Sequence, residues 1–165
     1  MDTHLKGEFA VLKVLMRAVE KGWIASRPTR ECRYDLVLDD KVKLYRVQVK
    51  YANRLASHTK GAIHLALTQS GIRKKNPYLD SEVDALIVYI APADMLIWLE
   101  TSHFHKKRQL HIRYEPGKNK QRQGILLAEN YIWLAAYSVR VSALVSGTSR
   151  PGSSPGKPTR QATCL

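Results

Sequence analysis

The chain has 165 residues, enough for one domain with a sizeable core, and 44% of them are hydrophobic. Its 27 lysine and arginine residues against 14 aspartate and glutamate residues give a formal net charge of +13, which is typical of a protein that binds a polyanion such as nucleic acid. Residues 1–10 lack the apolar centre of a signal peptide and no run approaches 18 apolar residues, so we expect a cytoplasmic protein, neither secreted nor membrane-spanning.

Residues 3–21 are predicted to form an amphipathic helix, with Thr3 as a candidate cap and Gly22 as a stop signal. The apolar residues that recur at helical spacing, and so predict the buried face, are Leu5, Leu12, Leu15 and Val19. Glu8 lies on the same stripe, where its burial would cost free energy unless a positive group meets it. Glu8 therefore either complements the helix dipole or takes part in a site.

Residues 33–52 predict a β-hairpin whose second strand has two distinct faces. One face carries Tyr45, Val47, Val49 and Tyr51, and the other carries Arg46, Gln48, Lys50 and Ala52. A loop of even length, either residues 40–41 or residues 40–43, brings Asp35 onto the face of Gln48 and Lys50. These three side chains then lie within roughly 5 to 8 Å of one another, a span that a hydrated metal ion and a phosphate can bridge.

Such a polar trio is also common on the solvated face of a half-covered sheet. Glu8 favours a functional site, because a helix packed on the sheet would direct its carboxylate toward Asp35, Gln48 and Lys50. The spacing alone leaves both interpretations open.

The rest of the chain predicts four strands and a second helix. The strands are expected at residues 62–68, 84–90, 95–100 and 109–115, and the helix at residues 125–138. From Ser146 the composition changes to serine, glycine, proline and threonine. We therefore predict a folded domain over residues 1–145 and a flexible tail over residues 146–165, which is not necessarily native to the domain.

The order of the polar residues resembles the pattern of the PD-(D/E)XK nuclease superfamily. In that superfamily a helical Glu precedes an Asp, and an acidic-X-Lys triplet follows on the next strand; here Glu8, Asp35 and residues 48–50 occupy these places. Tyr34 stands where the family name has Pro. Gln48 stands where Glu or Asp is usual, which removes one negative charge from the metal site.

Residues 1 to about 145 are similar to homing endonucleases encoded by group I introns in cyanobacterial tRNA genes, which are tetrameric members of this superfamily. The resemblance implies an α/β fold with a restriction-endonuclease-like core, in which an N-terminal helix packs on a mixed sheet with a catalytic hairpin, plus a C-terminal helix. It implies site-specific double-strand cleavage of a long DNA target in an intronless tRNA gene. It also implies a tetramer built as a dimer of dimers.

The chemistry of phosphodiester hydrolysis suggests a role for each candidate. Oxygen ligands suit Mg²⁺, with Mn²⁺ as a substitute, so the metal ligands are expected to be Asp35, the Gln48 amide oxygen and the Val49 carbonyl. Glu8 would bind through a water or hold a second, weaker ion. Lys50 would orient or deprotonate the attacking water. We expect one well-held metal per subunit.

Basic segments are the candidates for DNA contact, although such segments are often only solvated surface. The candidate residues are Arg73, Lys74, Lys75, Lys106, Lys107, Lys118, Lys120, Gln121 and Arg122. His103, His105 and His111 are interpreted as a surface or DNA-facing set, because no cysteine or carboxylate motif accompanies them. Two alternatives stay open: a junction-resolving nuclease of the same fold, and a non-catalytic basic DNA-binding module.

Overall fold

A computed structural model describes residues 1–56, 60–67, 77–116 and 126–133 of the chain. All of these residues belong to one unit, Met1–Leu134, and a second unit, Ala135–Leu165, lies outside the described residues together with the predicted tail. The elements, in chain order, are α1 (Thr3–Glu20), β1 (Ile24–Ser26), β2 (Leu36–Asp39), β3 (Leu44–Ala52), β4 (Ala62–Ala66), β5 (Ala85–Ile90), η1 (Ala91–Ala93), β6 (Met95–Glu100), α2 (Thr101–Phe104), β7 (Gln109–Arg113), β8 (Leu126–Leu127) and η2 (Ala128–Tyr131).

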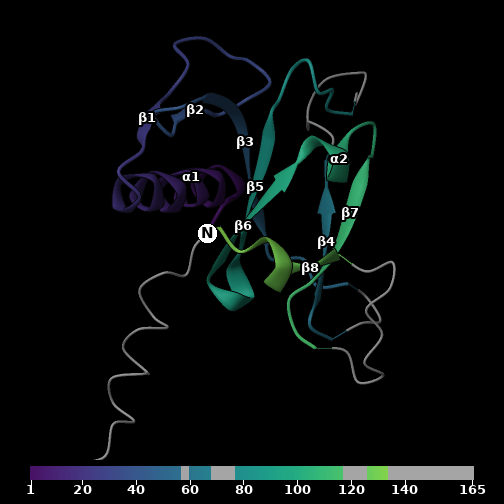
Figure 1. Cartoon of the computed structure of the whole chain (residues 1–165). Helices are drawn as coiled ribbons and strands as arrows, with labels where there is room; N and C mark the ends of the chain where they lie inside the picture. The colour runs from purple at the N-terminus through teal and green to yellow at the C-terminus, as the bar shows by residue number, and fades with distance from the viewer. Residues whose placement is uncertain (57–59, 68–76, 117–125, 134–165) are drawn as a thin grey trace, which may run out of the picture. The chain divides into compact units, whose positions relative to one another are not determined.

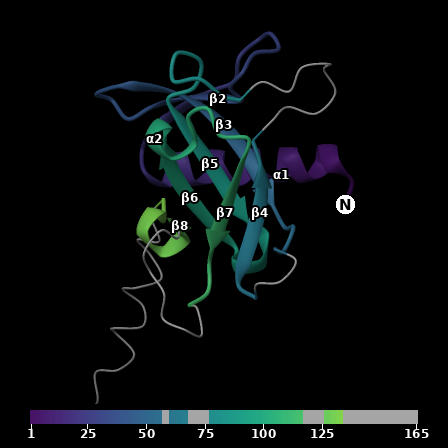
Figure 2. The same ribbon diagram turned by 90° about the vertical axis from the view of Figure 1, so that its right-hand side faces the viewer.

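Within the described residues, helix α1, a five-stranded sheet and a three-stranded sheet form successive layers (Figures 1 and 2). The larger sheet has the order β1-β2-β3-β5-β6, with β3 and β5 parallel and the other neighbours antiparallel. The smaller sheet has the order β4-β7-β8. The strands predicted at 62–68, 84–90, 95–100 and 109–115 correspond to β4, β5, β6 and β7. The predicted α/β class with a mixed sheet is confirmed.

Two apolar clusters hold the layers together, one on each face of the larger sheet. The cluster between α1 and the sheet includes Val14, Leu36, Val47 and Ile87. The cluster between the two sheets includes Ile63, Leu86, Phe104 and Ile112. Alternate residues of β5 enter different clusters, which explains why this central strand reads as a continuous apolar run.

Helix α1 begins and ends with local hydrogen bonds. Asp2, and not Thr3, is the N-cap, because its side chain accepts the N–H of Leu5 at 3.0 Å. At the other end Gly22 adopts a φ of 69°, a left-handed conformation that glycine adopts without a steric penalty. Among the described residues, no helix has both the length and the apolarity required to cross a membrane.

The predicted core stripe of α1 is wrong for Leu5, Leu12 and Val19, whereas Leu15 packs partly buried against the cluster between the helix and the sheet. The residues that the helix buries are small ones, Ala10, Val11, Val14 and Ala18. Leu5, Leu12 and Val19 are 57%, 53% and 74% exposed. Both sides of this helix are apolar, so periodicity does not determine which one faces the sheet, and the side with small residues lets the helix approach the sheet closely.

The predicted helix at residues 125–138 is also wrong over the part that the structure describes. Residues 126–127 form β8 beside β7, and η2 follows. Ile132 then bridges Ile97, and the N–H of Trp133 donates to the carbonyl of Leu96 at 2.9 Å. Strand pairing thus overrides the helical pattern. Ala128 and Trp133 are buried within the same chain, so apolar residues of this stretch contribute to the core.

Candidate active site

The hairpin of β2 and β3 has the longer of the two predicted loops, residues 40–43. The Asp40 carboxylate accepts the N–H groups of Val42 and Lys43 at 2.9 and 2.7 Å, and these bonds hold the turn. They also lower the pKa of Asp40 below its usual value. The even loop length is what places Asp35 on the same face as Gln48 and Lys50.

Asp35, Gln48 and Val49 form a connected set of polar groups. The Gln48 amide Nε2 donates to Asp35 Oδ2 at 2.5 Å and to the Val49 carbonyl at 3.3 Å. The backbone N–H of Val49 donates to the same Asp35 oxygen at 2.8 Å. Gln48 is buried, with 9% of its surface exposed. The structure therefore brings together three of the residues that the sequence predicts for the site.

The oxygen atoms of this set suit a hard divalent cation. A carboxylate oxygen of Asp35 and the carbonyl oxygen of Val49 converge on the Gln48 NH₂ group, a positively polarised group. A divalent cation would be attracted to the same two oxygens, those of Asp35 and Val49. If the Gln48 side-chain amide rotated, its oxygen would point toward that cation as a third ligand. Across the described residues no group of three or more His, Cys, Asp or Glu side chains is arranged to hold a metal ion. The site thus has few charged ligands.

The environment of Asp35 makes its charged form less favourable than it is in water. Burial raises the pKa of this carboxyl above its usual value of 3.8, and the Glu8 charge acts in the same direction. The Val49 N–H bond, the Lys50 charge and the Gln48 bond oppose this increase in the pKa. A positive ion beside Asp35 would therefore relieve an unfavourable charge.

Lys50 lies beside Asp35, from the same strand as Gln48. Its side chain is half-buried and Nζ lies 5.5 Å from the ring centre of Tyr78. Tyr78 is 2% exposed, and its ring also receives the guanidinium of Arg33 at 4.6 Å. Sequence periodicity gave no indication of Tyr78, because it belongs to no strand or helix.

The carboxylate of Glu8 is not buried in the site. Arg27 Nη1 and Nη2 both donate to Glu8 Oε2 at 3.1 Å, and the Glu8 side chain is 58% exposed. Helix α1 covers the face of the sheet opposite to Gln48, so only the charge of Glu8 acts on Asp35. The predicted burial of Glu8 is wrong, since the stripe to which it belongs faces away from the sheet.

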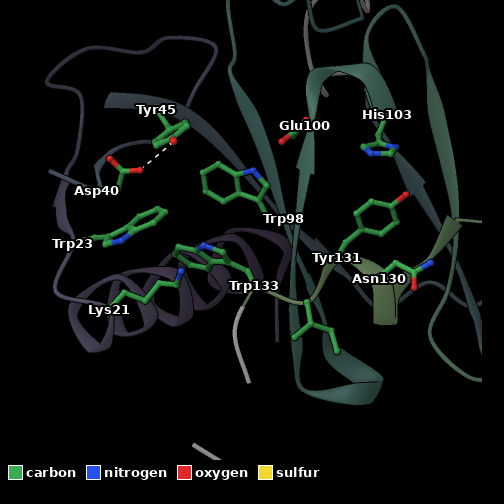
Figure 3. A pocket seen from close by; sticks show the side chains of 11 residues that line it. Lys21, Trp23, Asp40, Tyr45, Trp98, Glu100, His103, Asn130, Tyr131 and Trp133 are labelled. Carbon is green, nitrogen blue, oxygen red and sulfur yellow. Dashed lines mark hydrogen bonds between the residues drawn. The ribbon is translucent and has the colours of Figure 1, made fainter. Parts of the chain in front are cut away.

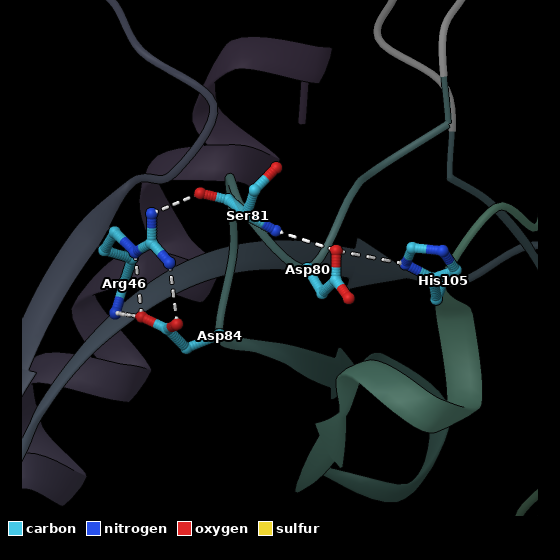
Figure 4. Close-up of polar contacts among 5 residues, drawn as sticks. All are labelled: Arg46, Asp80, Ser81, Asp84 and His105. Carbon is cyan, nitrogen blue, oxygen red and sulfur yellow. Dashed lines mark hydrogen bonds and ion pairs between the residues drawn. The ribbon is translucent and has the colours of Figure 1, made fainter.

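An ion pair between Arg46 and Asp84 fixes the strand that carries the site (Figure 4). Asp84 accepts the Arg46 backbone N–H at 2.7 Å, Nε at 2.9 Å and Nη2 at 2.8 Å. These bonds keep the pKa of Asp84 below its usual value. Arg46 Nη1 also donates to the Ser81 carbonyl. Asp84 immediately precedes β5, so the pair locks the parallel register of β3 and β5 beside Gln48.

Further polar contacts connect the neighbouring segment, residues 77–84. Arg33 pairs with Glu82 at 3.3 Å and donates to the Pro77 carbonyl at 3.0 Å. Asp80 lies 3.7 Å from His105, also drawn in Figure 4. The segment that carries Tyr78 is therefore anchored to the start of β2 and to the end of α2.

Lys106 and Lys107 are exposed at the turn between α2 and β7, where Lys106 adopts a φ of 56°. Phe104, the last residue of α2, packs against Tyr78, and the Lys106 N–H donates to the Tyr78 carbonyl at 3.3 Å. The two lysines therefore lie beside the segment of Tyr78, whose ring contacts Lys50. The other predicted DNA-binding residues, which are Arg73, Lys74, Lys75, Lys118, Lys120, Gln121 and Arg122, lie outside the described residues.

The outer face of β4 and β7 is a polar surface that sequence analysis found only in part. His64 and His111 are direct partners across the two strands, with ring centres 5.0 Å apart. His64 Nε2 lies 2.8 Å from Gln109 Oε1, and Arg113 follows on the same face. The opposite face of these strands is in the core. The sequence predicted that His111 lies at the surface. Its position beside His64 depends on the pairing of β4 with β7, which are distant in sequence.

A separate pocket of about 630 Å³ lies along β6, between the end of α1 and residues of α2 and η2 (Figure 3). Its walls are aromatic: Trp23 stacks on Tyr45 with centres 6.1 Å apart, and Trp98 and Trp133 complete the group. Lys21 lies 4.5 Å from the centre of the Trp23 ring. Asp35, Gln48 and Lys50 do not line this pocket. The aromatic group joins the end of α1 to the sheet and is distinct from the candidate site.

A model of the PD-(D/E)XK endonuclease family matches residues 1–134. The chain belongs to the PD-(D/E)XK endonuclease family. Endonucleases of this family generally use divalent metal ions. The assignment of Gln48, Val49 and Lys50 to the family triplet stays a prediction from the sequence.

Solved structures of similar fold include two DNA-processing nucleases. The bacterial homing endonuclease I-Ssp6803I has a TM-score of 0.66 and 20% identity, and the match covers 90% of this chain and 100% of that one. The Holliday junction resolvase Hjc of Archaeoglobus fulgidus has a TM-score of 0.43 and 12% identity, over 66% of this chain and 84% of that one. No curated protein sequence matches the chain. The likeness to I-Ssp6803I shows a shared fold.

Proposed function

We propose that this PD-(D/E)XK endonuclease is a site-specific, metal-dependent enzyme that hydrolyses both strands of duplex DNA. The observation that carries the proposal is the set of Asp35, Gln48 and Val49, with Lys50 beside it on the same strand. Partial burial raises the pKa of the Asp35 carboxyl, whereas a carboxylate on an ordinary solvated strand face stays in water. This difference favours a functional site over a solvated polar face.

The residues of the chain divide the work of hydrolysis. Asp35, the Gln48 amide oxygen and the Val49 carbonyl would hold Mg²⁺, or Mn²⁺ in its place; Glu8 would contribute through a water. The bound ion supplies charge stabilisation at the phosphate and lowers the pKa of a water. Lys50 would orient the attacking water, or in its neutral form accept the proton of that water, and a cation beside Asp35 would favour the charged carboxylate.

The outer face of β4 and β7 supports the proposal of DNA as the substrate. A two-stranded ribbon fits the major groove of B-DNA, and Gln109, His111 and Arg113 alternate outward along β7. The amide of Gln109 and the guanidinium of Arg113 are groups that read adenine and guanine. Lys106 and Lys107 precede this strand and would contact phosphates, together with the predicted basic segments around residues 73–75 and 118–122.

The sequence resemblance and the fold shared with I-Ssp6803I support a homing function. We propose a long target in an intronless tRNA gene, read by a tetramer arranged as a dimer of dimers. A target of more than about 20 base pairs extends to roughly 70 Å, beyond the reach of one unit of this size. A double-strand cut also requires two copies of Asp35 and Lys50, one for each strand.

The proposal is tested by cleavage of three substrates by the full chain. Linear duplexes that tile bacterial tRNA genes, random linear duplexes and a four-way junction are each incubated with Mg²⁺, with Mn²⁺ or with a chelator. Paired cuts at one position of a tRNA gene, only with metal, are expected. Cleavage confined to the junction would favour a resolving nuclease, and binding without cleavage of any substrate would favour a DNA-binding module.

A further inference from the structure

Helix α1 exposes a row of large apolar side chains, here called the α1 stripe. Its members are Leu5, Phe9, Leu12, Met16 and Val19, with exposures of 57%, 36%, 53%, 63% and 74%. They follow one another at spacings of four, three, four and three residues. This is the heptad spacing by which two helices pack along a common seam.

The α1 stripe is not a by-product of helix burial, because the helix is already anchored on its other side. Ala10, Val14 and Ala18 are fully buried against the sheet, about half a turn away from the stripe. The outer side of such a helix is expected to be polar. Five side chains of this size expose on the order of 500 Å² together, an area typical of an interaction surface.

We propose that the α1 stripe is a homodimer interface, at which α1 of a second copy of this chain packs in the antiparallel direction. The stripe is nearly symmetric about Leu12, so reversal of one helix sets Leu5 against Val19 of the partner subunit. Residues that flank the row would extend the buried area toward the roughly 800 Å² per subunit of a standard interface.

Charge supports the antiparallel direction. On one flank of the stripe lie Lys6, Lys13 and Glu20, and in an antiparallel pair this flank meets its own copy. Lys6, which has no ion pair among the described residues, then faces the partner's Glu20 at both ends of the seam. Glu20 already binds Arg17 of its own chain, so its carboxylate would lie between two cations. The helix dipoles also oppose each other.

A parallel pair would instead bring Glu8 to Lys13 of the other copy. Both groups already have partners, because Glu8 binds Arg27 at 3.1 Å and Lys13 binds Asp94 at 2.8 Å. In the antiparallel pair the two Lys13 side chains come near the centre, where each is neutralised by its own Asp94. The ion pairs of Glu8 with Arg27 and of Lys13 with Asp94 are therefore kept.

An interface through α1 would leave the outer face of β4 and β7 uncovered. The α1 stripe and the outer face of β4 and β7 lie on opposite sides of the two-sheet core (Figures 1 and 2). A pair joined through α1 therefore leaves both His64 faces free and directs them away from each other. The interface itself does not depend on the proposed nuclease activity, because none of the five residues of the α1 stripe belongs to the candidate metal site.

The first test is the mass of the full chain in solution, by sedimentation equilibrium, without DNA or metal. Leu12→Glu is compared with wild type, and Val42→Glu is the matched control, because Val42 is 93% exposed in the hairpin loop. We expect Leu12→Glu to raise the dissociation constant by at least about 100-fold while retaining its helical circular dichroism. Val42→Glu should keep the mass of wild type.

The second test is disulfide trapping, with Cys32→Ser and Cys164→Ser as the background. Leu5→Cys and Val19→Cys are oxidised separately, and then as an equimolar mixture. The antiparallel seam predicts a cross-linked dimer in the mixture and little in either variant alone. Cross-linking of each variant with itself would contradict the antiparallel direction.

A wild-type chain that stays monomeric at micromolar concentration would overturn the interface. An oligomer whose mass is unchanged in a folded Leu12→Glu variant would overturn it as well, because assembly would then use another surface. Thermal unfolding of each variant identifies a loss of mass that comes from unfolding.

Discussion

Asp84→Asn tests whether the ion pair with Arg46 positions the candidate active site. Asp84 accepts three hydrogen bonds from Arg46, one from the backbone and two from the guanidinium. The substitution keeps the size of the side chain but replaces one acceptor oxygen with a donor group. It also removes the charge that faces the guanidinium.

The magnitude follows from the number of bonds and their exposure. A hydrogen bond to a charged group contributes about 1.5 to 3 kcal/mol, and the Arg46 and Asp84 side chains are 38% and 25% exposed, so solvent weakens the pair. With at least one bond lost and the others weakened, we expect a loss of about 2 kcal/mol. For a unit of this size that corresponds to roughly 6 to 10 °C in Tm.

The effect has a defined pH dependence. The folded state lowers the pKa of Asp84 below 3.8, so its contribution to stability is present above that value and is lost as the pH falls through the folded pKa. Urea unfolding at pH 7 should therefore show the full difference between wild type and Asp84→Asn. The difference should shrink progressively below about pH 4.

Asp94→Asn is the matched control for this substitution. Asp94 also pairs with a cation, Lys13 at 2.8 Å, but it is 67% exposed and its other bond, from Tyr89, is distant from Gln48. We expect a smaller loss of stability and unchanged cleavage with Asp94→Asn. Equal stability of Asp84→Asn and wild type at pH 7, or full cleavage in a destabilised Asp84→Asn, would refute the positioning role.

Three further predictions concern the candidate site and the DNA-facing surface. Gln48→Glu should retain more metal-dependent cleavage than Gln48→Leu, because only glutamate keeps an oxygen ligand. Mg²⁺ should also raise the Tm of Gln48→Glu more than that of wild type, because two carboxylates then lie side by side. Equal cleavage by the two variants would argue that Gln48 does not contact the metal. Asp35→Asn should raise stability at pH 7, since burial raises the pKa of this carboxyl above 3.8 in the folded state. The gain should vanish below that pH, and its absence at pH 7 in calorimetry would contradict the burial argument. Lys107→Gln should lower the salt slope of duplex binding by about one, because it removes a phosphate contact, whereas Arg17→Gln on α1 should leave the slope unchanged. The reverse result would move the DNA to the other side of the molecule.

The hairpin could be predicted from sequence because its determinants are local. Strand alternation assigned Gln48 and Lys50 to one face, and the turn residues after β2 restricted the loop to two lengths. Asp35 was predicted to join them on the condition that the loop has an even length, and the observed loop, residues 40–43, meets it. The contact between the Asp35 carboxylate and the Gln48 amide then required only that the strands pair.

Other features depend on contacts that are distant in sequence. The two apolar sides of α1 differ in side-chain size, and only the curvature and packing of the sheet select the side with Ala10 and Ala18. Arg46 and Asp84 are separated by 38 residues, and strand periodicity gives no indication that they pair. The stretch around Trp133 has a helical pattern, but pairing with β6 determines its conformation.

The proposal that Asp35 is the centre of a metal-dependent nuclease is tested most directly by Asp35→Ala. Binding and cleavage of the same tRNA-gene duplexes are measured for this variant and for wild type, with Mg²⁺ and with a chelator. We predict binding within a few-fold of wild type and cleavage reduced by at least about 10³-fold, because a metal ligand is lost while the phosphate contacts remain. Mg²⁺-dependent cleavage by Asp35→Ala at the wild-type rate would contradict the proposed site.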